Sequence, residues 1–288
     1  MYKVDPKART LARHYTGPKD MVVNAVPKPM FTAPEDAIVR ITHCYICRPH
    51  PHMYSGESDS AVKKGDIMGH EAIGIVDEIG PEVKSVQKGD RVIISPVVAC
   101  GYCFCCKRKV SNEHRGQSSP RKSQLTRVTR RRTRSATEPT RPRKRRACGG
   151  YPGNQAESCR VPNADIVLVR GPKPGISPEK LLALADFTTT AWHGCELAEV
   201  GKGDVVGVWG CDPVGLSIQN LSFCRGAKKV YAVDPHPQRL KIAERLGCES
   251  ASARTSSRSV SCSASRTDLT KESRLAASEA RRAGRAQL

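Results

Sequence analysis

Histidine and cysteine side chains in the first half of the sequence have a spacing that suits metal binding. His70 stands in the Gly-His-Glu corner Gly69–Glu71, directly before the apolar, β-branched segment Ala72–Val76, which predicts a buried strand. Cys47 lies upstream, and three cysteines at intervals of three residues lie downstream: Cys100, Cys103 and Cys106. Imidazole and thiolate groups are preferred zinc ligands. A single histidine is more often structural, but this set together indicates a metal site.

A dinucleotide site is indicated by the segment Val205–Asp234. Its pattern predicts an apolar strand at Val205–Trp209, a helix over Pro213–Cys224 and a second strand over Lys228–Asp234. The turn between the first strand and the helix, Gly210-Cys-Asp-Pro-Val-Gly215, stands where the motif G-x-G-x-x-G begins. A turn between a strand and a helix is the context that pyrophosphate binding requires.

Two acidic residues set the expected properties of this site. Asp212 replaces the second glycine of the motif, which lets the backbone approach the pyrophosphate, so we expect its carboxylate to weaken phosphate binding. Asp234 ends the second predicted strand and suits an acid that accepts a hydrogen bond from a ribose 2′-hydroxyl and repels a 2′-phosphate. This favours NAD over NADP. The alternative is that Asp234 is only a turn residue before Pro235.

Further motifs accompany these candidates in a fixed order: Lys63–Glu71, Ala99–Cys103, Leu184–Asp186, Ala191–Gly194 and Trp209–Cys211. Together they resemble the zinc-dependent medium-chain alcohol dehydrogenase family, and within it the branch similar to glutathione-independent formaldehyde dehydrogenases. The resemblance covers residues 20–114 and 147–249. It implies an α/β plus β protein, in which a chaperonin-10-like (GroES-like) β-barrel catalytic domain is followed by a partial Rossmann doubly wound parallel sheet.

The resemblance also implies two zinc ions. The first is catalytic, keeps one position open for substrate, and is held by a thiolate, an imidazole and a carboxylate: Cys47, His70 and Asp186. Glu71 would lie beside this metal. The second is structural and is held by the three spaced thiolates: Cys100, Cys103 and Cys106. The family position of its fourth ligand is occupied by His114, with Cys105 as the alternative.

The residues after Cys47 follow the family pattern only in part. The resemblance implies that Arg48 contacts the pyrophosphate and that His52 relays the proton of the substrate. Pro49 stands where the family has a hydroxyl for that relay, and proline has none. His50 replaces an acid that orients its neighbours. Pro49, Asp212 and the absence of later strands of the dinucleotide-binding fold together predict a poor catalyst.

Short strands and turns predominate up to Val169, with predicted strands at Ala37–Cys44 and Arg91–Val98. Helices are predicted in three later segments: Lys180–Asp186, Thr189–Glu199 and Pro237–Leu246. Past Glu249 the pattern fails. We therefore predict a catalytic domain at residues 1–175, a partial dinucleotide-binding domain at 176–249 and a low-complexity tail at 250–288.

Positive charge is concentrated in two segments. Residues 115–146 hold 13 Lys and Arg against one Glu, and residues 250–288 hold eight against three acids, so these segments carry +17 of the net +20. The folded part is thus nearly neutral, and nucleic-acid binding by it is not expected. Three interpretations of 115–146 remain open: a disordered insert, a nuclear-localisation or nucleic-acid patch, and sequence read in a wrong frame or through an unspliced intron.

The remaining composition favours a cytoplasmic protein without a membrane span. No apolar run approaches transmembrane length, and Met1–Pro6 does not begin a signal peptide. The 13 cysteines are odd in number, which fits metal ligands and buried thiols better than a disulfide framework.

The predicted function is a zinc-dependent, NAD-linked oxidoreductase of a small alcohol or aldehyde. The alternatives are a non-catalytic zinc-binding remnant and a basic nucleic-acid-binding protein. The resemblance implies a homo-oligomer.

Overall fold

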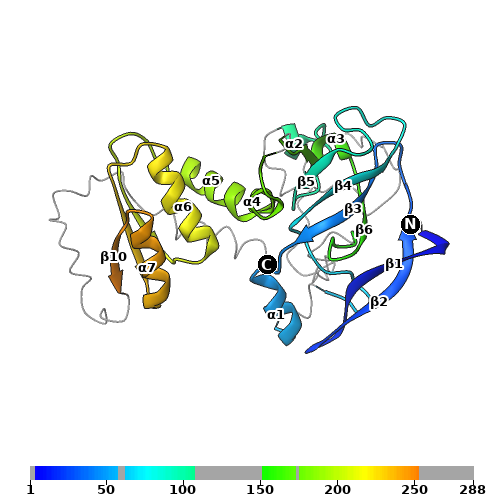
Figure 1. Ribbon diagram of the computed structural model, residues 1–288, viewed down its shortest axis with the longest axis horizontal. Coiled ribbons are helices and arrows are strands. Elements are labelled where there is room, and N and C mark those ends of the chain that lie inside the picture. Colours follow the sequence, from blue (N-terminus) through cyan, green and yellow to red (C-terminus); the bar gives the residue numbers. More distant parts are fainter. Residues whose placement is uncertain (1–3, 58–61, 108–150, 173–174, 253–288) are drawn as a thin grey trace, which may run out of the picture. The chain divides into compact units, whose positions relative to one another are not determined.

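The computed structural model describes residues 4–57, 62–107, 151–172 and 175–252 (Figure 1). The chain divides into two compact units, the first ending at Leu182 and the second beginning at Ala183. The first unit consists mainly of antiparallel strands, and the second alternates helices and strands. The basic segment 115–146 and residues 253–288 of the predicted tail lie outside the described residues, so the interpretations of 115–146 stay predictions.

A five-stranded antiparallel sheet forms the centre of the first unit, in the order β6-β3-β4-β5-β7. Its strands have the following bounds: β6 Ser158–Val161, β3 Ala37–Cys44, β4 Ala72–Ile79, β5 Arg91–Ile94 and β7 Leu168–Arg170. Val39, Val76 and Val92 are at most 1% exposed and belong to one apolar cluster. Because β-branched side chains pack well on a pleated surface, these segments favour strands. The strand predicted at Ala37–Cys44 is confirmed.

Two predicted strands differ in length from the observed ones. The strand predicted at Ala72–Val76 continues to Ile79, and the strand predicted at Arg91–Val98 ends at Ile94. Pro96 has no N–H group with which to extend the ladder, so the second prediction was too long.

Short helices and a hairpin complete the described part of the first unit. The helices are α1 Pro49–Ser55, α2 Phe104–Lys107, α3 Ala164–Val167 and α4 Pro178–Leu182. The hairpin pairs two antiparallel strands: β1 Val4–Gly17 and β2 Asp20–Pro29. No helix was predicted at α1. Pro49 nevertheless fits the first helical position, where no backbone donor is needed, and Gly56 ends the helix with a φ of +82°.

The second unit contains a three-stranded parallel sheet in the order β10-β9-β8 (Figure 1). Its elements are α5 Phe187–Leu197, β8 Val205–Trp209, α6 Pro213–Cys224, β9 Lys229–Asp234, α7 Pro237–Arg245 and β10 Glu249–Ser252. Val208, Ile218 and Val230 are at most 2% exposed and lie in the core shared by the sheet and its helices. The alternation of strand and helix is that of a partial Rossmann fold.

Three predictions for this part of the chain need correction. The helix predicted at Lys180–Asp186 is α4, at the end of the first unit, which begins at Pro178 and ends at Leu182. The helix predicted at Thr189–Glu199 is α5, which begins and ends two residues earlier. The pattern was predicted to fail past Glu249, whereas β10 pairs in parallel with β9. Serine and alanine have weak strand preference, so pairing with β9, and not local propensity, makes this segment a strand.

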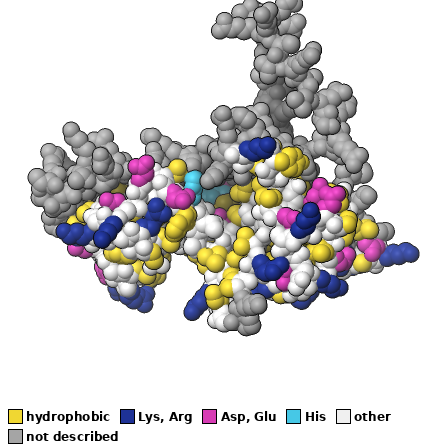
Figure 2. All heavy atoms as spheres, turned by 90° about the horizontal axis from the view of Figure 1, so that it is seen from above, with side chains coloured by type: hydrophobic (Ala, Val, Ile, Leu, Met, Phe, Trp, Pro, Cys, Tyr) yellow, Lys and Arg dark blue, Asp and Glu magenta, His cyan; other side chains and the backbone are white. Residues whose placement is uncertain are grey.

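Charged side chains of both signs are mixed on the surface of the described residues. In Figure 2, Lys and Arg lie scattered among Asp and Glu on the face that is shown. None of the helices within the described ranges is long and apolar enough to cross a membrane.

Candidate metal and nucleotide sites

His70 lies just before β4, in a corner that requires glycine. Gly69 has a φ of +104°, and a Cβ atom there would lie 2.6 Å from Asn154 Oδ1. On the neighbouring segment, the Tyr45 N–H donates to the Glu71 carbonyl at 3.1 Å. This hydrogen bond continues the pairing of β3 with β4, so the chain that follows β3 runs beside His70.

Cys47, His70 and Glu71 converge within the first unit. A thiol sulfur, a ring nitrogen and a carboxylate oxygen from these residues all lie within 4.8 Å of one another. Glu71 is 3% exposed. A carboxylate is rarely buried without groups that favour its charge, and a thiol and an imidazole beside it complete a donor set that suits zinc. The described residues therefore fit a divalent metal at this point.

His50 was not among the predicted site residues, although it touches both sides of this cluster. It is 4% exposed, and its ring stacks on His70 with the ring centroids 5.1 Å apart. Its Nδ1 accepts a hydrogen bond from the Cys47 N–H at 2.8 Å. Burial and the neighbouring His70 lower the pKa of His50 to about 4, so the ring is neutral near pH 7. The signal in the sequence that could have placed His50 at this cluster is its spacing of three residues from Cys47.

The other predicted catalytic residues lie around α1 or in the second unit. His52 is half exposed on α1, and its Nδ1 contacts Glu57 Oε2 at 2.7 Å. Arg48 is exposed and directly precedes α1. Asp186 belongs to the second unit and directly precedes α5, where its Oδ1 accepts a hydrogen bond from the Thr190 hydroxyl at 2.9 Å.

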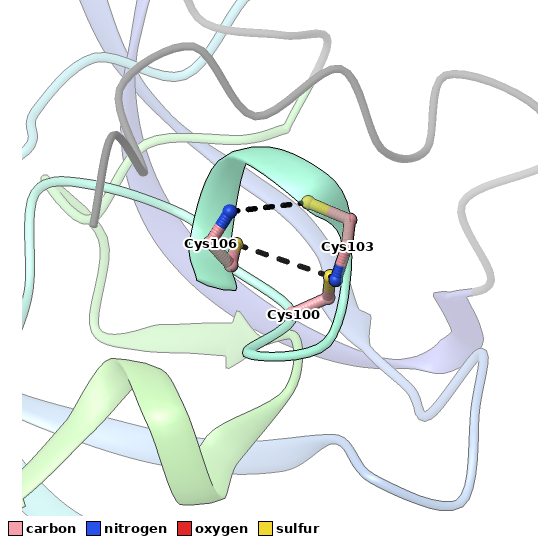
Figure 3. A group of neighbouring side chains, drawn as sticks. All are labelled: Cys100, Cys103 and Cys106. Carbon is pink, nitrogen blue, oxygen red and sulfur yellow. Dashed lines mark hydrogen bonds between the residues drawn. The ribbon is translucent and has the colours of Figure 1, made fainter. Parts of the chain in front are cut away.

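The three spaced cysteines lie on one turn of chain around α2, with their sulfurs close together (Figure 3). The Cys103 N–H donates to Cys100 Sγ at 3.4 Å, and the Cys106 N–H donates to Cys103 Sγ at 3.5 Å. The sulfurs of Cys100 and Cys106 are 4.0 Å apart. Backbone donors directed at sulfur favour thiolates, which are the form that binds metal.

Two thiols of this cluster have pKa values shifted in opposite directions: burial raises the pKa of Cys100, whereas that of Cys106 is lowered. Burial opposes ionisation of Cys106, but hydrogen bonds from the backbone and from the neighbouring thiols lower its pKa to about 7. Of the two candidates for the fourth ligand, Cys105 is part of α2 and His114 lies outside the described residues. The described residues thus provide three converging thiols that suit a metal ion.

The turn between β8 and α6 has the geometry that its glycines predict. Gly210 has a φ of +107°, which favours glycine. A Cβ atom at Gly215 would lie 1.9 Å from the Gly210 carbonyl oxygen, so glycine is needed for the close packing of α6 on β8. Asp212 caps α6, and its Oδ1 accepts a hydrogen bond from the Gly215 N–H at 2.9 Å. This carboxylate therefore occupies a backbone donor of the kind that binds phosphate.

Asp234 ends β9 and is 2% exposed. Its Oδ2 accepts a hydrogen bond from the Cys211 N–H at 2.7 Å, and its Oδ1 accepts one from the His236 N–H at 2.8 Å. Burial opposes ionisation, but these two donors and the nearby Arg239 lower the pKa of Asp234 below its ordinary value. The carboxylate is therefore charged and fixed beside the turn between β8 and α6.

Comparison with known proteins identifies the family. Residues 33–171 match the alcohol dehydrogenase GroES-like domain. A zinc-type alcohol dehydrogenase-like protein of Schizosaccharomyces pombe is 38% identical over 243 residues, which cover 84% of this chain and 55% of that protein. A medium-chain reductase/dehydrogenase of an Acremonium species is 33% identical, with 81% of this chain and 72% of that protein covered. The chain belongs to the zinc-type medium-chain alcohol dehydrogenase family.

Formaldehyde dehydrogenases are among the relatives that this chain matches. The glutathione-independent enzyme of Pseudomonas aeruginosa is 33% identical over 247 residues, which cover 82% of this chain and 56% of that protein. The solved alcohol dehydrogenase from Thermus sp. ATN1 has a TM-score of 0.71 and 29% identity, with 85% of this chain and 63% of that chain covered. The predicted family and GroES-like domain are confirmed, and the chain spans about half the length of the first curated relatives.

Proposed function

We propose that this chain is a zinc-dependent oxidoreductase that acts on an alcohol or aldehyde with NAD as hydride acceptor. The convergence of Cys47, His70 and Glu71 carries the proposal, because it provides metal-binding chemistry at positions that match the family's motif. The Pseudomonas aeruginosa relative is a formaldehyde dehydrogenase. Formaldehyde and simple primary alcohols are therefore the first substrates to test.

Three ligands are proposed for the catalytic metal. Cys47 and His70 come from the first unit, and Asp186, carried over from the family pattern, comes from the second. Zinc bound by them would supply polarisation of a substrate oxygen, and NAD would supply the hydride acceptor. His50 holds the backbone of Cys47 and the ring of His70, which restricts both ligands.

Proton release is assigned to His52. Its ring is half exposed and pairs with the Glu57 carboxylate, so it is able to hold a proton and pass it to solvent. Pro49 offers no hydroxyl between the substrate and this histidine. We therefore expect proton transfer to be slow in this chain.

The nucleotide is assigned to the turn of the second unit. Gly210 would form the tight turn, Gly215 would let α6 pack closely on β8, Arg48 would contact the pyrophosphate, and Asp234 would accept a hydrogen bond from the ribose. Asp212 opposes binding, because its carboxylate caps the Gly215 N–H and brings negative charge toward the phosphates.

A second zinc ion is assigned to the cysteine turn around α2. Its proposed ligands are three thiolates and one imidazole: Cys100, Cys103, Cys106 and His114. The backbone donors that face two of the sulfurs support this role, which is structural because a closed set of four ligands leaves no position for substrate.

A steady-state assay of NADH formation tests the function. The unmodified chain and a Pro49→Thr, Asp212→Gly double variant are compared with formaldehyde and primary alcohols as substrates. We expect slow turnover by the unmodified chain and a rise of about 10²-fold in the double variant, since a proton relay is typically worth about 10²–10⁴ in rate. Absence of turnover in both, with zinc and NAD bound, would contradict the proposal.

A non-catalytic zinc-binding protein is the second candidate, favoured by the two departures at Pro49 and Asp212. Elemental analysis that finds zinc, combined with an inactive double variant, would support this candidate.

The nucleic-acid alternative depends on residues 115–146, which lie outside the described residues. Salt-sensitive binding to DNA by the full chain would support that alternative. A cytoplasmic location and a homo-oligomer stay predictions.

A further inference from the structure

Gln219 is a polar residue without any exposure, in the interior of the second unit. It belongs to α6, and both ends of its side-chain amide form hydrogen bonds with thiols. Its Nε2 donates to Cys211 Sγ at 3.2 Å, and Cys248 Sγ donates to its Oε1 at 3.6 Å. Burying an amide costs free energy unless its donor and its acceptor are both hydrogen-bonded. When they are, the hydrogen bonds fix the positions of the partner groups, which an apolar side chain would not do.

The partners of Gln219 lead to the nucleotide turn. Cys211 is the residue after Gly210, is 1% exposed, and donates its N–H to Asp234 Oδ2. Gln219 donates to the side chain of Cys211, and the Asp234 carboxylate accepts from the Cys211 backbone N–H. Cys248, which directly precedes β10, anchors the far end of the amide. Burial raises the pKa of both thiols, to about 11 for Cys248, so both are protonated at neutral pH and suited to neutral hydrogen bonds.

We propose that Gln219 is a positioning residue for the dinucleotide: it holds Cys211 so that the Cys211 N–H keeps the Asp234 carboxylate turned toward the ribose. The inference rests on the proposed function, because it places NAD at the turn between β8 and α6. Loss of the amide frees Cys211 and removes one of the two backbone donors that orient Asp234. NAD, which gains from that orientation, is then bound less tightly, whereas NADP gains nothing from it. Gln219 therefore helps to determine the preference between the two nucleotides.

Calorimetric titration of the full, zinc-loaded chain with NAD and with NADP tests this inference. Gln219→Met removes the amide and nearly conserves the volume of the side chain. We expect it to weaken NAD binding about tenfold and to change NADP binding by less than about twofold, since a hydrogen bond to a charged group is worth about that factor. Ser222→Ala is the matched control: Ser222 is also fully buried on α6, but its hydroxyl bonds Ile218 within the helix, so both affinities should stay unchanged.

The outcomes separate the inference from the proposed function. An unchanged NADP-to-NAD ratio in Gln219→Met, or an equal loss of both affinities, would overturn the positioning role while leaving the function intact. Absence of binding of both nucleotides by the unmodified chain would overturn the nucleotide part of the function and this inference with it. If Gln219→Met does not fold, Cys211→Ala removes the other end of the same hydrogen bond and carries the same expectation.

Discussion

The candidate metal cluster, formed by Cys47, His70 and Glu71 in the first unit, differs from the candidate nucleotide turn between β8 and α6 in how well its surroundings support the proposed chemistry. At the metal cluster, the neighbours help the candidate ligands: neutral His50 holds the Cys47 backbone and stacks on His70. At the turn, the glycines have the required geometry, but Asp212 occupies the Gly215 N–H with its own carboxylate. Metal binding should therefore be robust in this chain, and nucleotide binding weak.

The largest effect is expected from loss of a metal ligand. His70→Ala should reduce NADH formation by about 10³-fold, because the polarisation that a metal supplies is worth several kcal/mol. The control is His193→Ala, since His193 is exposed on α5 and pairs with the Glu196 carboxylate at 3.8 Å. Comparable rates in His70→Ala and the unmodified chain, measured in the same assay, would remove His70 from the site.

A methyl group at Gly215 should disrupt the turn itself. In Gly215→Ala the added Cβ would lie 1.9 Å from the Gly210 carbonyl oxygen, so we expect the free energy of unfolding to fall by about 3 kcal/mol. Gly194→Ala on α5 is the control, because its Cβ would meet Ile218 only at 3.7 Å. Chemical denaturation measures both variants. Equal stability of the two would show that α6 moves away from β8 without penalty.

Two substitutions of His50 distinguish the effect of its ring stacking on His70 from that of its hydrogen bond with the Cys47 N–H. His50→Phe keeps a ring to stack on His70 but loses the acceptor for the Cys47 N–H, and His50→Gln does the reverse. Groups that orient metal ligands typically contribute about 10–100-fold to affinity. We expect about a tenfold weaker zinc affinity for His50→Phe in competition with a chelator, and a smaller loss for His50→Gln. Wild-type affinity in both variants would mean that His50 only fills space.

The smallest expected effect is a gain at the nucleotide turn. Asp212→Gly frees the Gly215 N–H and removes a negative charge, so NAD affinity should rise about fivefold while the helix loses only a few tenths of a kcal/mol of capping. Asp212→Asn keeps a capping oxygen without the charge and should give an intermediate affinity. Fluorescence titration with NADH measures both. Weaker binding by Asp212→Gly would show that the cap shapes the turn for the nucleotide.

Much of the fold follows from local sequence. β3 agrees with its prediction because apolar, β-branched residues alternate there, and α6 because Asp212 and Pro213 mark its start. β10 was missed because Glu249–Ser252 has no strand preference of its own and depends on pairing with β9. α1 was not predicted because prolines usually indicate that a segment is not helical. The first position of a helix tolerates a proline, however, and Pro49 occupies that position.

The candidate sites were predicted where residue type and spacing carry the information. Cys47, His70, Glu71 and the three spaced cysteines do converge within the first unit. His50 and Gln219 were not found, since their roles depend on contacts between segments: a ring stacked on His70, and an amide between two thiols. A buried polar side chain of this kind has no signature in sequence, because the same residue is ordinary on a surface.

Zinc content tests the central claim most directly. The purified chain, dialysed to remove loosely bound metal, should hold one to two zinc ions by elemental analysis. Cys100→Ser should lose one ion, and Asp186→Ala should lose the other, which assigns the two sites separately. A purified chain that holds no zinc would contradict the claim that this protein is a zinc-binding member of its family.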